Sequence, residues 1–461
     1  MGKIESSLKL LTNNNLEIAN KNLTQLLEEY KYKKKPIQVD FRKLVSWERC
    51  GERFTHRIHP YPAKLIQQIP VFFLSNDILS KKGDYVLDPF SGSGTVLLEA
   101  ILQGRHAIGS DSNPLARLIT SVKTSKVNRT TLESLLNNIE NNLDSCTTSY
   151  KPEVVNMDYW FNKKAKNQLT KIYNCITSIP NKKYRDFFLL CLSATAKRVS
   201  YADPRLSVPV KLNKNRFEVD SKNYIAVSRK LSLLDGIDSL SVFREICEIN
   251  IKRAESLSNE LNLKKLKPKI KLFNDARKLM QVGKKVYDSS VQLVITSPPY
   301  AGAQKYIRSS SLCLGWTGLC KPHELRKYED KNIGREHYVK HTYQELLITG
   351  ISQADSLLAQ IHKINPLRAH IAANYLLEMK DAIKEAYRVL KSGGYFVLVS
   401  SNNRICKFDF NTHVYLVKIA KDIGFQVTLE LVDEIHSRGL MTKRNKTAGI
   451  INCEYIYLLK K

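Results

Sequence analysis

Short apolar runs alternate with longer amphipathic segments from about residue 84 onward, and this pattern predicts strands and helices in turn. The expected strands lie at 85–87, 106–109, 270–273, 291–295, 395–399 and 454–459. Helices are expected at 95–103 and 374–390, the second closed by Gly393-Gly394 because glycine commonly ends a helix. Short strands alternating with helices favour a parallel sheet with crossover helices. The sequence therefore predicts the α/β fold class.

Two stretches interrupt the alternation. Residues 127–265 are helix-forming and basic, with an irregular basic portion at 197–222, whereas 303–370 show no regular period. Residues 1–40 are polar and helix-forming, and they end in a run of lysines before Pro36 that marks a boundary. The expected units are a helical N-terminal arm at 1–45, a first part of the core at 46–126, a helix-rich basic insert at 127–265, and a second part of the core at 266–461 that carries an irregular insert at 303–370.

The charge balance indicates a polyanionic partner. Lys and Arg number 73 against 44 Asp and Glu, which gives a formal net charge of +29. Such an excess favours nucleic acid, because basic side chains that neutralise phosphates release counterions and steer association. A generally basic, well-solvated surface would give the same count. Charge alone leaves both interpretations open.

Cysteine usage and hydropathy exclude two classes of protein. The nine cysteines are scattered and form no C-x-x-C pair, so we expect reduced thiols and no metal site. No run of eighteen apolar residues occurs, and the first residues lack the apolar segment of a secretory signal. We therefore expect a cytoplasmic protein without a membrane partner.

The first motif with chemical meaning lies where a predicted strand turns into a predicted helix, and it reads Asp88-Pro89-Phe90-Ser91-Gly92-Ser93-Gly94-Thr95. Glycines there let the backbone approach a ligand, and a helix N-terminus offers free N–H groups. A lone G-x-G also fits an ordinary tight turn. Leu97 replaces the third glycine of a dinucleotide fingerprint and no G-K-[ST] follows, which weakens NAD and ATP as ligands. Asp111 ends the next strand, where a carboxylate can accept both hydroxyls of a ribose.

The second motif is Thr296-Ser297-Pro298-Pro299-Tyr300, directly after the apolar strand at 291–295. Two successive prolines fix φ and force Ser297 into an extended geometry, which makes the segment a rigid ledge. Open α/β sheets bind ligands at the carboxyl edge of their strands. A Pro-Pro-Tyr could also simply terminate a strand, but its occurrence together with the Asp88 motif favours a site.

Together the two segments resemble motifs I and IV of the amino-methylating DNA methyltransferases. The form Thr-Ser-Pro-Pro-Tyr is most similar to the cytosine-N4 branch, whereas adenine-N6 members more often carry Asp or Asn in place of Ser297. The segment His59-Pro60-Tyr61-Pro62-Ala63-Lys64 resembles motif X, which helps to enclose the cofactor, and Asn274-Asp275-Ala276 resembles the acidic motif that meets the adenine. The resemblance covers most of the predicted core and neither insert. Cytosine-N4 enzymes often place the Pro-Pro-Tyr motif before the glycine motif, and here the order is reversed, as in the α arrangement of the family.

The resemblance implies a Rossmann-like sheet that binds S-adenosylmethionine as methyl donor and double-stranded DNA as substrate. The residues expected at the cofactor are Tyr61, Pro62, Ala63, Lys64, Asp88, Pro89, Phe90, Ser91, Gly92, Gly94, Thr95, Asp111, Asn113 and Asp275. The residues expected at the reacting base are Ser297, Pro298, Pro299 and Tyr300.

The chemistry of an exocyclic amino group suggests how these residues act. Its lone pair is delocalised into the ring, so the enzyme must localise it. Ser297 and the main-chain carbonyl of Pro298 are expected to accept the amino hydrogens while the methyl donor is held in line. Tyr300 is expected to stack on the extruded base, since a base inside the duplex is out of reach.

DNA contacts are expected on the basic insert and just after the catalytic motif. The candidates are Arg198, Arg205, Lys211, Lys214, Arg216, Lys305 and Arg308, although each could equally be a solvated surface charge. The resemblance also implies a prokaryotic restriction-modification or defence setting beside the nucleoid. It leaves a cognate restriction endonuclease or a defence-system subunit open as a protein partner.

Three other functions stay open at this point. The same chemistry could act on adenine N6, which differs only in pocket shape. An RNA amino-methyltransferase shares the fold, but it would carry Asn or Asp in place of Ser297. A non-catalytic DNA-binding subunit is disfavoured, because both the glycine turn and the Ser-Pro-Pro-Tyr are intact.

Overall fold

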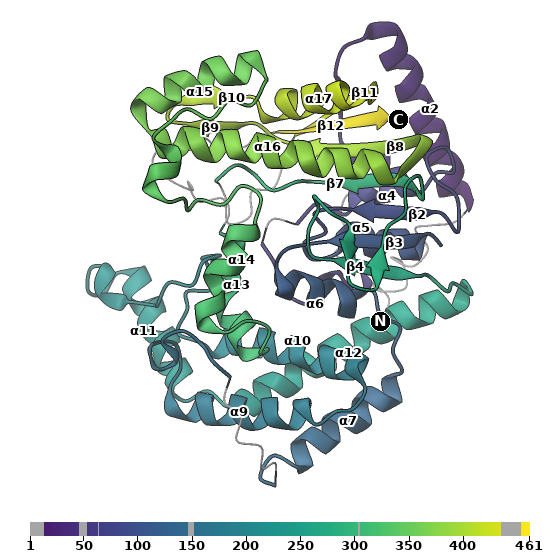
Figure 1. Cartoon of the computed structure of the whole chain (residues 1–461). Coiled ribbons are helices and arrows are strands. Elements are labelled where there is room, and N and C mark those ends of the chain that lie inside the picture. The colour runs from purple at the N-terminus through teal and green to yellow at the C-terminus, as the bar shows by residue number, and fades with distance from the viewer. Residues whose placement is uncertain (1–12, 46–52, 63, 146–151, 303–304, 435–452) are drawn as a thin grey trace.

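An eight-stranded sheet dominates the computed structural model, which describes residues 13–45, 53–62, 64–145, 152–302, 305–434 and 453–461 (Figure 1). The strands lie in the order β1-β11-β12-β8-β7-β2-β3-β4. Their bounds are β1 (Ile37–Val39), β2 (Tyr85–Asp88), β3 (His106–Ser110), β4 (Ile270–Phe273), β7 (Val291–Thr296), β8 (Leu390–Ser400), β11 (Gln426–Glu434) and β12 (Cys453–Lys460). The run from β4 to β8 is parallel, and β12 is antiparallel to both of its neighbours. The expected strands are thus confirmed, and the α/β class with them.

Helices cover both faces of the sheet (Figure 1). Val86 packs in a core with α5 (Thr95–Leu102) and α4 (Gln68–Leu74), whereas the next residue, Leu87, packs in a core with α16 (Pro366–Val389). Successive strand residues point to opposite faces, so a strand buried on both sides must be apolar throughout. Further helices of this part are α2 (Asn13–Lys33), α3 (Phe41–Leu44), η1 (Phe54–Arg57), α6 (Pro114–Lys123), α15 (Ser352–Ile364) and α17 (Thr412–Ile423). The arrangement is Rossmann-like.

A helical lobe lies on one side of the sheet, in the lower half of Figure 1. It consists of α7 (Arg129–Asn141), α8 (Met157–Trp160), α9 (Lys163–Thr177), α10 (Lys182–Val199), η2 (Lys214–Arg216), α11 (Lys222–Asp235) and α12 (Ser239–Leu263). The buried α10 carries Phe187 and Phe188 into a core shared with α6 and α12. The helices of this lobe all lie within residues 127–265.

The stretch at 303–370 differs from the expected irregular insert. It contains α13 (Tyr306–Trp316), η3 (Pro322–Glu324), α14 (Leu325–Lys331), η4 (Lys340–Tyr343), α15 and the start of α16. The α13 helix is buried on most sides, with Leu314 and Trp316 fully enclosed by the lobe. A helix buried over most of its surface has only a narrow polar stripe, so its sequence shows little amphipathic period.

The expected closure of a helix by Gly393-Gly394 is wrong. The helix ends at Val389, and both glycines lie inside β8. Gly393 has φ +72° and donates its N–H to the carbonyl of Lys461 at 2.9 Å, where the register between β7 and β8 shifts. A glycine within a strand commonly marks such an irregularity, and it mimics a helix cap in sequence.

The N-terminal segment set apart as an arm contributes to the sheet. Its helix α2 buries Leu23 in the sheet core, and β1 pairs in parallel with β11. Two small hairpins, β5 (Met280–Gln281) with β6 (Lys284–Lys285) and β9 (Asn403–Ile405) with β10 (Phe408–Phe410), complete the strands. Seven cysteines of the described residues are free thiols, whereas Cys50 and Cys146 lie outside those residues. Across the described ranges, no helix has the length and apolar character needed to cross a bilayer.

Candidate active site

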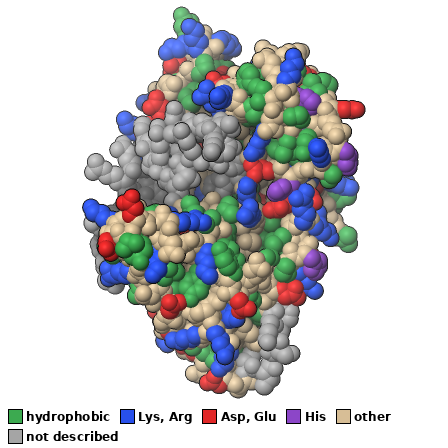
Figure 2. All heavy atoms as spheres, turned by 90° about the vertical axis from the view of Figure 1, so that its left-hand side faces the viewer, with side chains coloured by type: hydrophobic (Ala, Val, Ile, Leu, Met, Phe, Trp, Pro, Cys, Tyr) green, Lys and Arg blue, Asp and Glu red, His purple; other side chains and the backbone are tan. Residues whose placement is uncertain are grey.

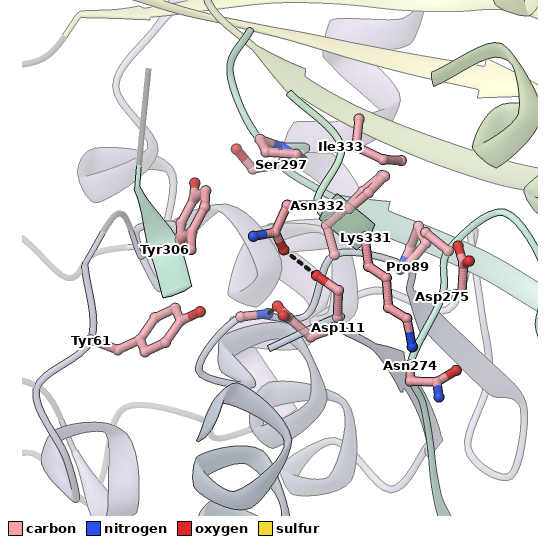
Figure 3. Close-up of a pocket in the computed structure, with 15 residues that line it drawn as sticks. Tyr61, Pro89, Asp111, Asn274, Asp275, Ser297, Tyr306, Lys331, Asn332 and Ile333 are labelled. Atoms are coloured by element: carbon pink, nitrogen blue, oxygen red, sulfur yellow. Dashed lines mark hydrogen bonds between the residues drawn. The ribbon is translucent and has the colours of Figure 1, made fainter. Parts of the chain in front are cut away.

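A pocket opens at the carboxyl edge of β2, β3, β4 and β7, where the two motifs meet (Figure 3). In this view Tyr61 and Tyr306 stand on one side of the pocket and Asn274 and Asp275 on the other, with Ser297 between the two sides. The lining residues are Tyr61, Pro89, Phe90, Gly92, Asp111, Ser112, Asn274, Asp275, Ala276, Ser297, Pro299, Tyr306, Lys331, Asn332 and Ile333. Four parallel strands therefore deliver the expected cofactor and catalytic motifs to one place.

The glycine turn after β2 requires its glycines. Gly94 has φ +76° and precedes α5, and its N–H donates to the carbonyl of Ser91 at 2.6 Å. A Cβ placed on Gly94 would lie 2.8 Å from both Oγ1 and Cγ2 of Thr120, which belongs to α6. Thr120 in turn donates its hydroxyl to the carbonyl of Gly92 at 3.1 Å. The turn is thus packed directly against α6, with no room for a side chain.

Replacing Gly94 by alanine should reduce both stability and cofactor affinity. The matched control is Gly83→Ala, since Gly83 also has a left-handed φ (+87°) but no atom within 4 Å of its Cβ position. Backbone strain alone costs ~1–2 kcal/mol at such a residue, so the control should lose that amount only. Denaturant unfolding and calorimetric titration with the cofactor measure both effects. Equal losses in the two variants would contradict the proposed contact with Thr120.

Asp111 presents a carboxylate to the pocket from the end of β3. Its Oδ2 accepts the N–H of Gly92 at 3.0 Å and its Oδ1 accepts the N–H of Asn113 at 2.8 Å. Each carboxylate oxygen has a second lone pair, so acceptor capacity remains on the pocket side. Burial raises the pKa of Asp111 to about 6, although both N–H groups and Arg117 oppose the shift. Asp111 therefore offers hydrogen-bond acceptors to a ligand in the pocket while it is ionised.

The pH dependence of cofactor binding should report on Asp111. Its pKa lies above its ordinary value of 3.8, so the carboxylate becomes protonated as the pH falls through about 6. Below that pH a single competing protonation weakens the affinity by about tenfold per pH unit. Titration calorimetry from pH 5 to 8 measures the slope. The Asp111→Asn variant should lose this dependence and keep only the contribution of the neighbouring Asp88, whose pKa burial raises to about 7; an unchanged slope would contradict the assignment.

The ledge after β7 is tied to the glycine turn. Thr296 donates its hydroxyl to Oδ1 of the buried Asp88 at 2.6 Å, across adjacent strands. Ser297 follows, half-buried, and among the described residues its hydroxyl has no hydrogen-bond partner. A hydroxyl that faces a pocket without a protein partner is available to a ligand.

The structure brings many of the expected residues to the pocket but not all. Tyr61, Pro89, Phe90, Gly92, Asp111, Asp275, Ser297 and Pro299 line it. Lys64 instead donates to the carbonyl of His56 at 3.1 Å, and Asn113 links the hydroxyl of Tyr61 to Ser310 of α13, at 3.3 and 3.0 Å. The expected residues outside the pocket lining are Pro62, Lys64, Asp88, Ser91, Gly94, Thr95, Asn113, Pro298 and Tyr300, and Ala63 lies outside the described residues.

Arg277 and the residues 331–333, at the end of α14 and just after it, were not expected at the pocket from the sequence. Arg277 holds both carboxylate oxygens of Asp275, at 2.9 and 3.1 Å. Lys331, Asn332 and Ile333 cross the pocket, and Asn332 forms a hydrogen bond with Ser112 (Figure 3). The Asp-x-Arg spacing could have indicated the Arg277 contact, because a single residue separates the two partners, whereas nothing in the sequence distinguishes residues 331–333.

The segment across the pocket limits its size. The pocket encloses about 80 Å³, below the ~300 to 1,000 Å³ typical of small-molecule sites. The N–H of Gly302 donates to the carbonyl of Gly334 at 3.0 Å, so this segment is also joined to the loop that follows the catalytic ledge. Residues 331–333 therefore form one boundary of the pocket.

The expected DNA-binding residues lie on the lobe and beside the ledge, and they differ in whether the side chain has a protein partner. Arg205 and Lys305 form ion pairs with Asp203 at 2.7 Å and with Glu336 at 3.1 Å. The others are Arg198, paired with Glu245; Lys211, above the rings of Tyr159 and Tyr201; Lys214, above Tyr224; and Arg216 and Arg308, both exposed. Figure 2 shows basic side chains spread over one face rather than gathered in one patch. Charge alone therefore does not locate a DNA surface.

Comparison with known proteins agrees with this geometry. Residues 13–120, which include the glycine turn but end before Ser297, match the family model N6_N4_Mtase, described as DNA methylase. The Type II methyltransferase M.MvaI of Kocuria varians is 22% identical over 419 residues, covering 87% of this chain and 88% of the relative. The Type II methyltransferase M.BsoBI of Geobacillus stearothermophilus is 25% identical over 435 residues, covering 84% and 81%. A solved SAM-dependent methyltransferase from Methanosarcina mazei covers 83% of this chain and 94% of its own, at 11% identity and a TM-score of 0.29, a likeness too distant to transfer residue roles.

Proposed function

Because the chain belongs to the amino-methylating DNA methyltransferases, which use S-adenosylmethionine, we propose that it methylates the exocyclic N4 of cytosine at specific sites in DNA. The choice of cytosine N4 over adenine N6 is based on Ser297. This residue stands where adenine-N6 members more often carry Asp or Asn, and its hydroxyl lines the pocket. A neutral hydroxyl at this point distinguishes the chain from those members.

The residues of the pocket suit the methyl donor. The cofactor supplies an electrophilic methyl group on a sulfonium. The glycine turn offers backbone N–H groups and close approach, Asp111 offers acceptors for the ribose, and Asn274 with Asp275 offers polar groups for the adenine. The ring of Tyr61 closes the pocket beside Gly92, 3.6 Å from the position of its missing Cβ.

Ser297 and Pro298 make the amino group nucleophilic. The amino N–H groups donate to Oγ of Ser297 and to the carbonyl of Pro298, which draws the nitrogen lone pair out of the ring. The two prolines hold both acceptors rigidly, so little reorganisation is needed when positive charge develops. The proton that the nitrogen then loses passes through the Ser297 hydroxyl to water, since a hydroxyl both accepts and donates.

Aromatic side chains hold the extruded base. Tyr300 keeps the proposed stacking role, and Tyr306 adds a second ring that lines the pocket itself. Both lie close to the buried Tyr375, whose pKa is raised by burial and then by these two phenols. The three tyrosines form one cluster next to the ledge, which suits a base brought out of the duplex at a cost of a few kcal/mol.

The proposed contacts with DNA lie on the lobe and on α13. Arg216 and Arg308 are the best of the proposed phosphate contacts, because both are exposed and neither forms an ion pair among the described residues. By analogy with the Type II relatives, we place the protein in a restriction-modification system, with a cognate endonuclease as its functional partner.

Methylation in living cells tests this function. Plasmid DNA from cells that make the wild-type chain should carry N4-methylcytosine in one recurrent sequence, and DNA from cells that make Ser297→Ala should not. Sequencing that detects modified bases supplies both the base and its context. N6-methyladenine in the wild-type sample would overturn the choice of base, and unmodified DNA would overturn the proposed activity.

A further inference from the structure

A second, larger cavity lies where the helical lobe meets the 57–62 segment and α13. It encloses about 540 Å³, within the ~300 to 1,000 Å³ range of ligand sites. Its walls come from the 57–62 segment, α10, the 202–209 loop, α11, α12 and α13. Tyr61 lines both this cavity and the pocket of the candidate active site, here called the reaction pocket, so the two are neighbours.

The cavity combines an apolar wall with a basic rim. Its apolar residues include Ile58, Leu206, Ile246, Ile249 and Leu312. Its cations are Arg57, Lys197, Arg198, Lys230 and Arg253. Asp203 is the sole carboxylate in the described lining, and Arg205 already holds both of its oxygens. A site of this composition suits a ligand with a flat apolar part and an anionic part.

Two lysines at this cavity lack counter-ions. Lys197 on α10 and Lys230 on α11 are both half-buried, and neither amine has a hydrogen-bond or ion-pair partner among the described residues. The positive charge of Lys197 acts on the neighbouring His59. Burial lowers the pKa of His59 most, and the charge of Lys197 is the second-largest cause. Two amines at one cavity, with no partner in the described part of the chain, are available to an anionic group, and phosphate is such a group.

We propose that this cavity receives a nucleotide of the DNA substrate other than the one that is methylated. The base lies against the apolar wall, and its phosphate lies between Lys197 and Lys230. The proposal rests on the proposed DNA methylation. It is supported by α13, which presents Tyr306 to the reaction pocket and Leu312 to this cavity, so DNA that crosses one opening passes the other.

Paired charge variants test the phosphate contact. The double variant Lys197→Gln/Lys230→Gln should weaken binding to a mixed-sequence 30-base-pair duplex and lower the slope of log K against log salt by about 1 to 2. The control Lys222→Gln/Lys252→Gln removes the same charge from exposed positions outside the cavity and should change the slope by less than half as much. Cofactor affinity should stay unchanged in both. Equal slopes for the wild type and the cavity variant would overturn the proposal.

Photocrosslinking tests the position of the base. A duplex that carries 5-iododeoxyuridine should crosslink to peptides containing Leu206, Ile246 or Leu312, and the cavity-filling Ala194→Leu should suppress these crosslinks. Crosslinks found only elsewhere would overturn the proposal. The wild-type protein used here is first assayed for methyl transfer. A protein that methylates DNA but shows no cavity contact refutes this inference alone, whereas failure to methylate any DNA refutes the proposed function beneath it.

Discussion

Replacing Ser297 by alanine should lower the rate of methyl transfer by about 10²- to 10³-fold and leave the affinity for S-adenosylmethionine nearly unchanged. That loss is typical when one preorganised hydrogen-bonding group is removed from the site of developing charge. Ser297 lines the pocket and has no hydrogen-bond partner among the described residues, so its removal leaves no buried protein group unsatisfied. The effect should therefore fall on catalysis and not on folding.

Single-turnover kinetics and calorimetry separate the two quantities. The control is Ser290→Ala, at the opposite end of the same strand, where the hydroxyl donates to the carbonyl of Tyr287 at 2.6 Å. This control should keep wild-type kinetics. A Ser297→Ala enzyme with full activity, or one that has lost cofactor binding as well, would contradict the role given to the hydroxyl.

Replacing Glu99 by glutamine should destabilise the protein by ~3–5 kcal/mol, the usual result of breaking a buried ion pair from one side. Glu99 lies on α5 with no exposed surface. Its carboxylate accepts from Arg53 and from Nε2 of His56, each at 2.7 Å. Burial opposes its ionisation, but Arg53 and His56 outweigh burial and lower the pKa of Glu99 to about 2. The pair joins the segment that carries Tyr61 to the helix that follows the glycine turn.

An exposed ion pair, Glu133 with Arg129, provides the control for the Glu99 variant. Glu133 pairs with Arg129 at the same 2.7 Å, but both side chains are 46% exposed, so Glu133→Gln should cost at most ~1 kcal/mol. Denaturant unfolding compares the two variants. A lowered carboxyl pKa stabilises the fold above the ordinary value of 4.5, and this stabilisation is lost as the pH falls toward about 2. Equal losses for Glu99→Gln and Glu133→Gln would contradict the importance of burial.

The core of the fold could be predicted because its signals are local. The strand at 291–296 carries four aliphatic residues among its six positions and is followed after Ser297 by two prolines, so both its class and its end are visible in sequence. The glycine turn likewise combines a strand, two glycines and a helix within a few residues. Such motifs predict their own geometry, since each depends on backbone sterics near the site.

The remaining features depend on partners far away in the chain. The α13 helix shows little amphipathic period because the lobe buries most of its surface, and Asn332 lines the pocket in contact with Ser112, which is far away in the chain. Gly393 resembles a helix cap, and only its bond to Lys461 reveals a strand. The spacing of residues along the sequence does not predict these tertiary contacts.

Three of the expected segments meet at one pocket, but not every side chain within them reaches it. Tyr61, Asp111 and Ser297, each from a different segment, line the pocket together. Lys64 belongs to the same motif as Tyr61, yet it donates to the backbone of His56 outside the pocket lining. A motif fixes which backbone reaches a site, whereas the direction of each side chain depends on local packing.

Transfer of an isotope-labelled methyl group decides whether this chain methylates an amino group of DNA. The purified protein is incubated with S-adenosylmethionine carrying a deuterated methyl group and with mixed-sequence duplex DNA, which is then digested and analysed by mass spectrometry. We expect deuterated N4-methyldeoxycytidine, absent from the matched Ser297→Ala reaction. Label on carbon 5 of cytosine, or no labelled nucleoside at all, would contradict amino methylation of DNA by this chain.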